Sequence, residues 1–161
     1  MEKFVILIKT YKDDVYRTKR LLESIDKFNK DDIPVYLAIK EEEIDLFQNV
    51  LDNIKTHINI VSDEYIQPDC EKFRREILMQ SDDGWLYQQI IKSQFWVTEI
   101  AENYIAIDSE IVFLKDFYMS DFMYDDETPY VVMGERKEFL DEAYKLNKVK
   151  IQHDNKGRDM L

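Results

Sequence analysis

Residues 4–8 read Phe4-Val5-Ile6-Leu7-Ile8, five apolar side chains without a polar interruption. A strand with one solvated face alternates apolar and polar residues, whereas an unbroken run is typical of a parallel strand covered on both faces. The run is also far shorter than the ~20 residues that cross a membrane. It therefore predicts a strand inside a parallel sheet that has helices on both sides.

The apolar pattern changes period repeatedly along the rest of the chain, and helical stripes alternate with short strand-forming runs. Asp13 or Asp14 is a candidate N-cap for the first helix, and residues 69–83 are ambiguous. This alternation predicts an α/β fold with a mostly parallel sheet and helices on both faces. The expected order is strand 4–8, helix 13–28, strand 34–39, helix 44–54, strand 58–61, helix 85–103, strand 104–107, strand 129–133 and helix 137–146.

The chain is acidic, with 34 acidic and 22 basic residues and a formal charge of −12. Such a surface repels phosphate backbones and anionic lipids, so nucleic acids and membranes are poor candidate partners. One cysteine, Cys70, excludes an intrachain disulfide, and the cytoplasm is the expected location. Three glycines leave no room for a glycine-rich phosphate loop, so phosphate binding has to rely on side chains or a metal.

Ligands of open parallel sheets bind beyond the carboxyl ends of the strands. The most informative residues there are Asp108 and Glu110, two carboxylates that follow the strand expected at 104–107. Mg²⁺ and Mn²⁺ prefer such oxygens and often bind through one or two carboxylates plus substrate phosphates. The same two residues also fit a solvated turn at the end of a strand.

The segment Asp108-Ser109-Glu110 resembles the D-x-D region of GT-A glycosyltransferases. Four stretches in order also resemble a bacterial glycosyltransferase-like family of unknown function, and the likeness spans most of residues 4–135. The stretches are 4–11 (FVILIKTY), Asp63-Glu64, Gly84-Trp85 with Gln88-Gln89-Ile90-Ile91-Lys92, and Ile107-Asp108-Ser109-Glu110 with Val112-Phe113-Leu114.

This resemblance implies a GT-A-like nucleotide-sugar-binding domain over residues 1–150, followed by a polar tail over residues 151–161. It implies that Asp108 lies near the ribose or the metal and that Glu110 is a metal ligand, with Mn²⁺ or Mg²⁺ as cofactor. Glu110 departs from the second Asp of the family motif and carries its carboxylate one methylene farther out. The implied reaction is hexosyl transfer from a nucleoside-diphosphate sugar.

Three further groups are candidates for binding the nucleotide sugar. Thr10, Tyr11 and Asp13 follow the first strand, where GT-A folds bind the nucleoside; Asp13 also fits an N-cap and Tyr11 a packing role. Gln88 and Lys92 share one helix face, so Lys92 could neutralise a diphosphate or could be a solvated lysine. Asp63 fits either a donor-site carboxylate or a turn.

The late His153 is a weaker metal candidate because it lies in the polar tail, and His57 fits a structural or solvated role. No general base can be assigned, and the chain ends soon after the fifth expected strand. We therefore expect either a truncated form or fragment, or a small member that binds a nucleotide sugar without transferring it. Two alternatives stay open: a non-catalytic nucleotide-sugar-binding or interaction module on a degenerate scaffold, and an acidic α/β protein unrelated to sugars.

Overall fold

Strand β1 (Glu2–Lys9) lies inside a four-stranded sheet of order β3-β2-β1-β4, and every neighbouring pair of strands is parallel. The other strands are β2 (Val35–Ile39), β3 (Ile58–Ser62) and β4 (Ala101–Asp108). Residues 4–8 of β1 are at most 2% exposed, as their unbroken apolar run predicts. This computed structural model describes residues 1–51, 54–67 and 84–130.

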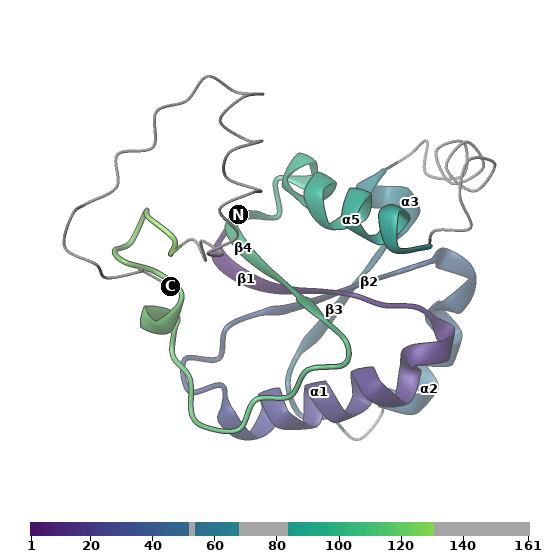
Figure 1. Cartoon of the computed structure of the whole chain (residues 1–161), viewed down its shortest axis with the longest axis horizontal. Helices are drawn as coiled ribbons and strands as arrows, with labels where there is room; N and C mark the ends of the chain where they lie inside the picture. The colour runs from purple at the N-terminus through teal and green to yellow at the C-terminus, as the bar shows by residue number, and fades with distance from the viewer. Residues whose placement is uncertain (52–53, 68–83, 131–161) are drawn as a thin grey trace, which may run out of the picture. The chain divides into compact units, whose positions relative to one another are not determined.

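Helices cover both faces of the sheet, so the predicted α/β class is confirmed (Figure 1). Helices α1 (Val15–Phe28) and α2 (Ile44–Leu51) lie on one face, and α3 (Asp63–Ile66) and α5 (Gly84–Gln94) lie on the other. Short 3-10 turns precede α1 and α2 at Lys12–Asp14 and Glu41–Glu43. No helix in the described ranges has the length and apolarity needed to span a membrane.

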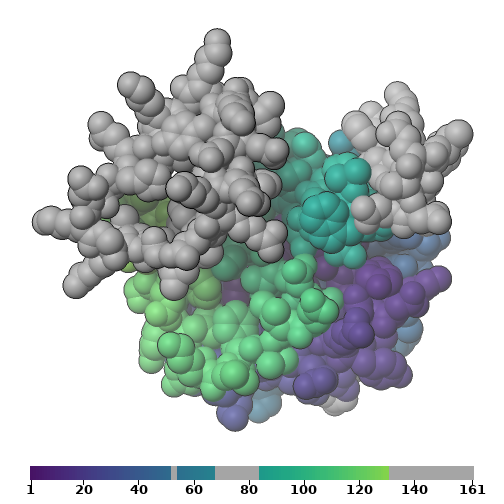
Figure 2. Space-filling model, viewed as in Figure 1, coloured from purple at the N-terminus to yellow at the C-terminus, as the bar shows by residue number. Residues whose placement is uncertain are grey.

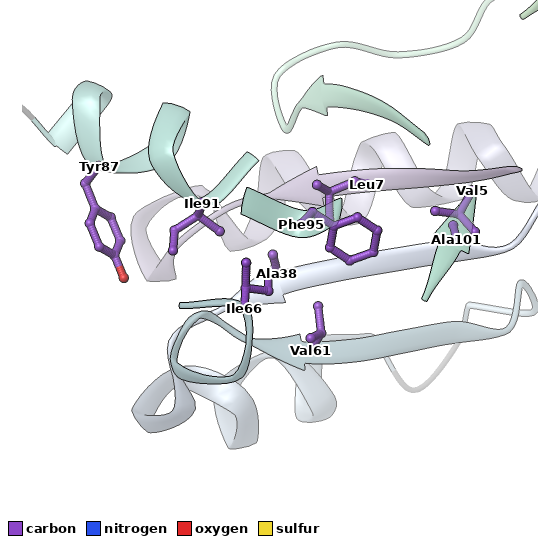
Figure 3. Packing of buried hydrophobic residues seen from close by; sticks show 9 residues of the cluster. All are labelled: Val5, Leu7, Ala38, Val61, Ile66, Tyr87, Ile91, Phe95 and Ala101. Atoms are coloured by element: carbon purple, nitrogen blue, oxygen red, sulfur yellow. The ribbon is translucent and has the colours of Figure 1, made fainter. Parts of the chain in front are cut away.

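The side chains of β1 alternate between the two halves of the core, because successive residues of a strand point to opposite faces. Val5 and Leu7 belong to one core cluster with Ile91 of α5 and with Phe95, the residue that follows α5 (Figure 3). Ile6 and Ile8 are buried on the other side, where α1 contributes its apolar stripe. The same alternation directs Lys9 toward α5 and Thr10 toward α1, which decides what each can contact.

The predicted helix over residues 85–103 is wrong at its carboxyl end. Helix α5 ends at Gln94, a 3-10 turn follows at Phe95–Thr98, and Glu99 has a φ of 52°. This left-handed conformation ends the helical path. β4 then begins at Ala101, three residues before the predicted strand, because Ala101 pairs with Glu2 of β1. The apolar residues from Phe95 to Ile100 fit helix and strand equally well, so periodicity alone misplaces the boundary.

Strands β1 to β3 and helices α1 and α2 lie where they are predicted, within a few residues at each end. Asp14 occupies the N-cap position of α1, but its side chain makes no capping hydrogen bond and accepts one from Arg17 instead. Of the predicted strand 129–133, Pro129 forms an isolated antiparallel bridge with Met123. The rest of that strand, the ambiguous segment 69–83, the helix 137–146 and the tail fall outside the described residues.

The chain forms two units, Met1–Phe122 and Met123–Leu161. Within the first unit, the segment after β4 runs back along α1 (Figure 2). Phe113 N donates to Ser24 Oγ at 3.0 Å, and Phe117 N donates to the carbonyl oxygen of Phe28 at 2.9 Å. These two hydrogen bonds hold the segment after β4 against α1.

Candidate functional site

The four strand ends form one polar edge of the sheet. We call this the carboxyl edge and define it as residues 9–14, 39–43, 62–63 and 108–110. Parallel pairing brings these residues together although they are far apart in the chain; Lys9 of β1, for example, pairs in register with Asp108 of β4. The carboxyl edge therefore gathers the residues predicted to bind a ligand, together with α5, which lies above it.

Asp108 and Lys92 form an ion pair at this edge. The ammonium group of Lys92 donates to Asp108 Oδ1, and the Lys92 side chain is 11% exposed while that of Asp108 is 60% exposed. Tyr104 Oη donates to the backbone carbonyl oxygen of Lys92 at 2.8 Å and fixes the helical turn that carries it. Lys92 is thus a buried, paired cation and is not the solvated helical lysine of the alternative interpretation.

A second, deeper ion pair joins Lys9 to Asp63. Lys9 Nζ lies 3.0 Å from Asp63 Oδ2, and both side chains are almost fully buried. Lys9 reaches Asp63 across the end of β2. Its ammonium group also donates to the carbonyl oxygen of Thr10, the next residue in the chain, at 2.7 Å. Tyr87 Oη of α5 donates to the same carboxylate oxygen at 3.0 Å, and Figure 3 shows the Tyr87 ring.

Burial is the largest influence on both charges of this pair. It lowers the pKa of Lys9 and raises the pKa of Asp63, and the attraction between the two groups opposes each shift. Asp63 Oδ1 is buried without a hydrogen-bond partner among the described residues. Asp63 is also the first residue of α3, whose N-cap Ser62 accepts from Tyr65 N. Because its side chain is fully buried, Asp63 is not available for direct contact with a ligand.

The residues after β1 divide into one buried and two accessible side chains. Thr10 is 1% exposed, and its hydroxyl is 2.8 Å from that of Thr18 in α1. Tyr11 is half-buried, and Asp13 is exposed in the 3-10 turn that follows. The neighbouring carboxylate of Asp14 raises the pKa of the Tyr11 hydroxyl. Of the predicted nucleoside contacts, Tyr11 and Asp13 can meet a ligand, whereas the Thr10 side chain links β1 to α1.

Gln88 and Glu110 flank the Lys92–Asp108 pair. Gln88 is half-buried one turn before Lys92 on α5, and its side chain makes no hydrogen bond to another described residue. Glu110 is exposed, and Ser109 between the two carboxylates is 7% exposed. The D-x-E segment therefore presents both of its acids to solvent and buries the serine between them.

These residues can supply only part of a metal's ligands. Within residues 1–51, 54–67 and 84–130, no three His, Cys, Asp or Glu side chains are grouped so that they could hold a metal ion. The pair Asp108 and Glu110 still fits the pattern in which one or two carboxylates bind Mg²⁺ or Mn²⁺ and substrate phosphates complete the shell. The other metal candidate, His153, lies outside the described residues.

Two further residues at the site, one in α5 and one in the carboxyl edge, were not predicted from the sequence. Tyr87 lies four residues before Ile91, a spacing that places both on the buried face of α5 and could have indicated its position. Glu43 is 5% exposed, and its Oε2 accepts from Lys12 N at 3.1 Å, which holds the turn after β1 against the turn after β2. It is the last of three consecutive glutamates, and nothing in the sequence distinguishes it from the other two.

A cavity of about 520 Å³ lies at the opposite edge of the sheet, and its lining includes Glu2, Tyr36 and Asn59. Asp26 forms part of its wall and accepts hydrogen bonds from Lys55 N and from the backbone and hydroxyl of Thr56, which anchors the approach to β3. None of the predicted site residues lines this cavity. Because ligands of open parallel sheets bind at the carboxyl ends of the strands, the carboxyl edge is the stronger candidate site.

Fold and edge together define an open, Rossmann-like parallel α/β domain with a charged candidate site at the ends of its strands. The chain belongs to a family of unknown function, DUF6492, whose model matches residues 4–160. A search of curated proteins gave no match. The family description states no activity, so the glycosyltransferase resemblance remains a prediction.

Proposed function

We propose that this chain binds a nucleoside-diphosphate sugar at the carboxyl edge, together with Mn²⁺ or Mg²⁺, and transfers the sugar to an acceptor. The observation that carries the proposal is the convergence of β1, β4 and α5 at Asp108. The end of β1 lies beside Asp108, and α5 directs the buried ammonium group of Lys92 at its carboxylate. A carboxylate and an ammonium group are thereby held where open α/β sheets bind ligands.

The charges at the edge explain why a cation belongs in this proposal. The ammonium groups of Lys9 and Lys92 each already neutralise a carboxylate. The carboxyl edge as defined contains eight acidic residues and three lysines, so it carries an excess of negative charge that Lys92 offsets only in part. A nucleoside diphosphate adds further negative charge, so binding is favourable only when a cation or a freed ammonium group compensates it.

Each residue has a role that follows from its exposure. Asp108 and Glu110 would hold the metal, which when bound acts as a Lewis acid toward the departing diphosphate. Lys92 would donate to phosphate oxygens, and Gln88 lies one turn away to orient the same group. Tyr11 and Asp13 are the accessible candidates for binding the nucleoside. Thr10 and Asp63 are buried, and their contacts with Thr18 and Lys9 hold the carboxyl edge in place.

A non-catalytic module that binds nucleotide sugars is the second candidate. No general base is assigned among the described residues, and the ammonium groups of Lys9 and Lys92 are each paired with a carboxylate. In either case we propose a cytoplasmic protein, since the sequence has one cysteine and no intrachain disulfide to maintain. Its charge of −12 argues against nucleic acid as a partner.

A thermal-shift panel tests the proposal with UDP, GDP, CDP and their sugars, each with and without Mn²⁺. At a ligand concentration near a hundred times Kd, binding contributes about 2.7 kcal/mol, which corresponds to a rise in Tm of about 5–10 °C for a domain of this size. We expect one nucleotide series to give such a rise with Mn²⁺. Asp108→Ala should abolish the rise in Tm, because it removes the carboxylate that pairs with Lys92 and that is proposed to bind the metal.

Asp116→Ala is the matched control for this panel. Asp116 also pairs with a lysine, Lys30, at 3.3 Å, and its side chain is 51% exposed, but it lies outside the carboxyl edge. The control should keep the full nucleotide response. A panel in which no nucleotide raises the Tm of the wild-type protein would refute the proposal. A rise without hydrolysis or transfer of the sugar would favour the binding module.

A further inference from the structure

The ammonium group of Lys92 is confined to the neighbourhood of Asp108. Helix α5 is tied to the sheet at two points, by Tyr87 Oη on Asp63 and by Tyr104 Oη on the carbonyl oxygen of Lys92. Ile91, the residue before Lys92, is fully buried between α5 and the sheet. With its helix fixed in this way, the ammonium group of Lys92 is held at the carboxyl edge, where its partner is Asp108.

Asp108 is consequently not a free carboxylate. One of its oxygens is held by Lys92, and the pair is electrically neutral as a unit. A divalent cation that binds Asp108 alone would lie close to the ammonium group, and the two positive charges would repel each other. Metal binding without a further anion is therefore opposed by Lys92.

The incomplete ligand set acts in the same direction. Asp108 and Glu110 offer two carboxylates, and the part of the chain that the structure describes brings no third acid, histidine or cysteine to them. Mg²⁺ and Mn²⁺ complete such partial sites with phosphate oxygens of the substrate. A diphosphate thus supplies what both cations require: acceptors for Lys92 and ligands for the metal.

We infer that Lys92 makes metal binding depend on the diphosphate: it occupies Asp108 until phosphate oxygens take over its ammonium group, and Asp108 then becomes a metal ligand. This inference rests on the proposed function and adds a specificity-determining role for Lys92. It implies that the metal and the nucleoside diphosphate bind cooperatively. By thermodynamic linkage, each raises the affinity for the other by the same factor.

The experiment measures Mn²⁺ affinity directly, from the loss of the free-ion electron paramagnetic resonance signal. Wild-type protein and Lys92→Met are titrated with Mn²⁺ alone and with Mn²⁺ plus the nucleotide that raises the Tm, or with UDP, GDP and CDP in turn. Protein-free titrations correct for Mn²⁺ bound by the nucleotide itself. Methionine keeps much of the buried aliphatic volume of Lys92 and removes its charge.

Wild-type protein should bind Mn²⁺ alone weakly, and about tenfold more tightly with the nucleotide. Lys92→Met should bind Mn²⁺ alone about tenfold more tightly than wild type and gain little more from the nucleotide. Lys30→Met is the matched control, because it removes a lysine paired with another exposed aspartate, Asp116, and changes the net charge equally. It should leave Mn²⁺ binding at the wild-type level.

The outcomes separate this inference from the proposed function. If a nucleotide binds but Lys92→Met binds Mn²⁺ no more tightly than wild type, the inference is overturned and the proposed function stands. If Lys92→Met gains Mn²⁺ affinity while no nucleotide binds any variant, the proposed function fails, and of the inference only the opposition of Lys92 to metal binding is left. Should Lys92→Met not fold, Asp108→Asn provides the test: it should lose Mn²⁺ binding with and without nucleotide, and retained binding would overturn the inference.

Discussion

At the scale of single residues, Lys9 and Asp63 form the most costly contact of the carboxyl edge. Each charge gives up its hydration on burial, and their mutual attraction repays that loss only when the geometry and additional hydrogen bonds are favourable. Burial outweighs attraction for both groups, since the pKa of Lys9 is lowered and that of Asp63 is raised. Asp63 Oδ1, without a partner among the described residues, adds to the cost. The pair is thus better understood as a positioning element than as a source of stability.

Lys9→Met should destabilise the fold by about 3–5 kcal/mol at pH 7, because it leaves the carboxylate of Asp63 buried without its counter-ion. The loss should shrink at pH 5. A carboxyl group whose folded pKa is raised gains relative stability as pH falls below that pKa, since the folded state then holds the proton more tightly than the unfolded chain. Urea denaturation of both proteins at the two pH values measures the difference.

The double variant Lys9→Met with Asp63→Asn is the control for this prediction. It removes both charges, keeps an oxygen that can accept from Tyr87, and should recover most of the lost stability. A deficit for Lys9→Met that is the same at pH 7 and pH 5 would contradict the assigned role of the Asp63 charge.

At the scale of elements, α5 links the two ion pairs of the edge. Its Tyr87 contacts Asp63, and its Lys92 contacts Asp108. The carbonyl oxygen of Lys92 lies in the last turn, where helices leave acceptors without intrahelical partners, and the Tyr104 hydroxyl satisfies it. Strand β4 therefore supplies both the partner of the Lys92 side chain and the cap of its backbone.

Tyr104→Phe should cost about 1 kcal/mol, the usual net value of one hydrogen bond. It should also speed amide hydrogen exchange in the last turn of α5 and in the 3-10 turn after it, while exchange in α1 stays unchanged. Urea denaturation and hydrogen exchange followed by mass spectrometry measure the two effects.

Tyr36→Phe is the matched control for Tyr104→Phe. The Tyr36 and Tyr104 rings both pack on Phe95, with centroid distances of 5.9 Å and 5.0 Å, but the Tyr36 hydroxyl makes no hydrogen bond to a described residue. It should change neither stability nor exchange by a comparable amount. Equal effects of the two substitutions would show that ring packing, and not the cap, holds α5.

The elements were more predictable from the sequence than the contacts of the site. An unbroken apolar run identifies β1, and helical stripes identify α1 and α2, because these patterns reflect which faces are buried. The end of α5 is not encoded in that way, since apolar residues continue through the turn at Glu99 into β4. The D-x-E segment and Lys92 could be selected as candidates, but their ion pair depends on where α5 lies. The Lys9–Asp63 pair left no signal, because it joins the end of β1 to the first residue of α3 across β2.

At the scale of the whole molecule, the charge of −12 works against compactness. The exposed ion pairs, such as Arg17–Asp14 and Lys30–Asp116, contribute little in compensation. The buried pairs are mostly shielded from added salt, which acts on charges at the surface. Screening should therefore reduce repulsion more than it weakens attraction.

The Tm should accordingly rise by about 2–4 °C, or about 1 kcal/mol, when ionic strength increases from about 0.01 M to about 0.1 M and the Debye length shortens from ~30 Å to ~10 Å. Differential scanning calorimetry in NaCl, repeated in KCl to exclude binding of a particular cation, measures it. A Tm that falls in both salts would mean that attractive surface pairs outweigh the net repulsion.

The interior place of β1 also matters during synthesis of the chain. β1 is made before the other three strands, and its neighbour β2 follows after one helix, but its other neighbour β4 begins only at Ala101. Until the ribosome has delivered β4, one edge of β1 keeps unpaired N–H and C=O groups beside five consecutive apolar side chains. Such an edge is a template for pairing with other chains. The nascent protein is thus most exposed to misassembly, and most in need of a chaperone, while the segment between β2 and β4 is being translated.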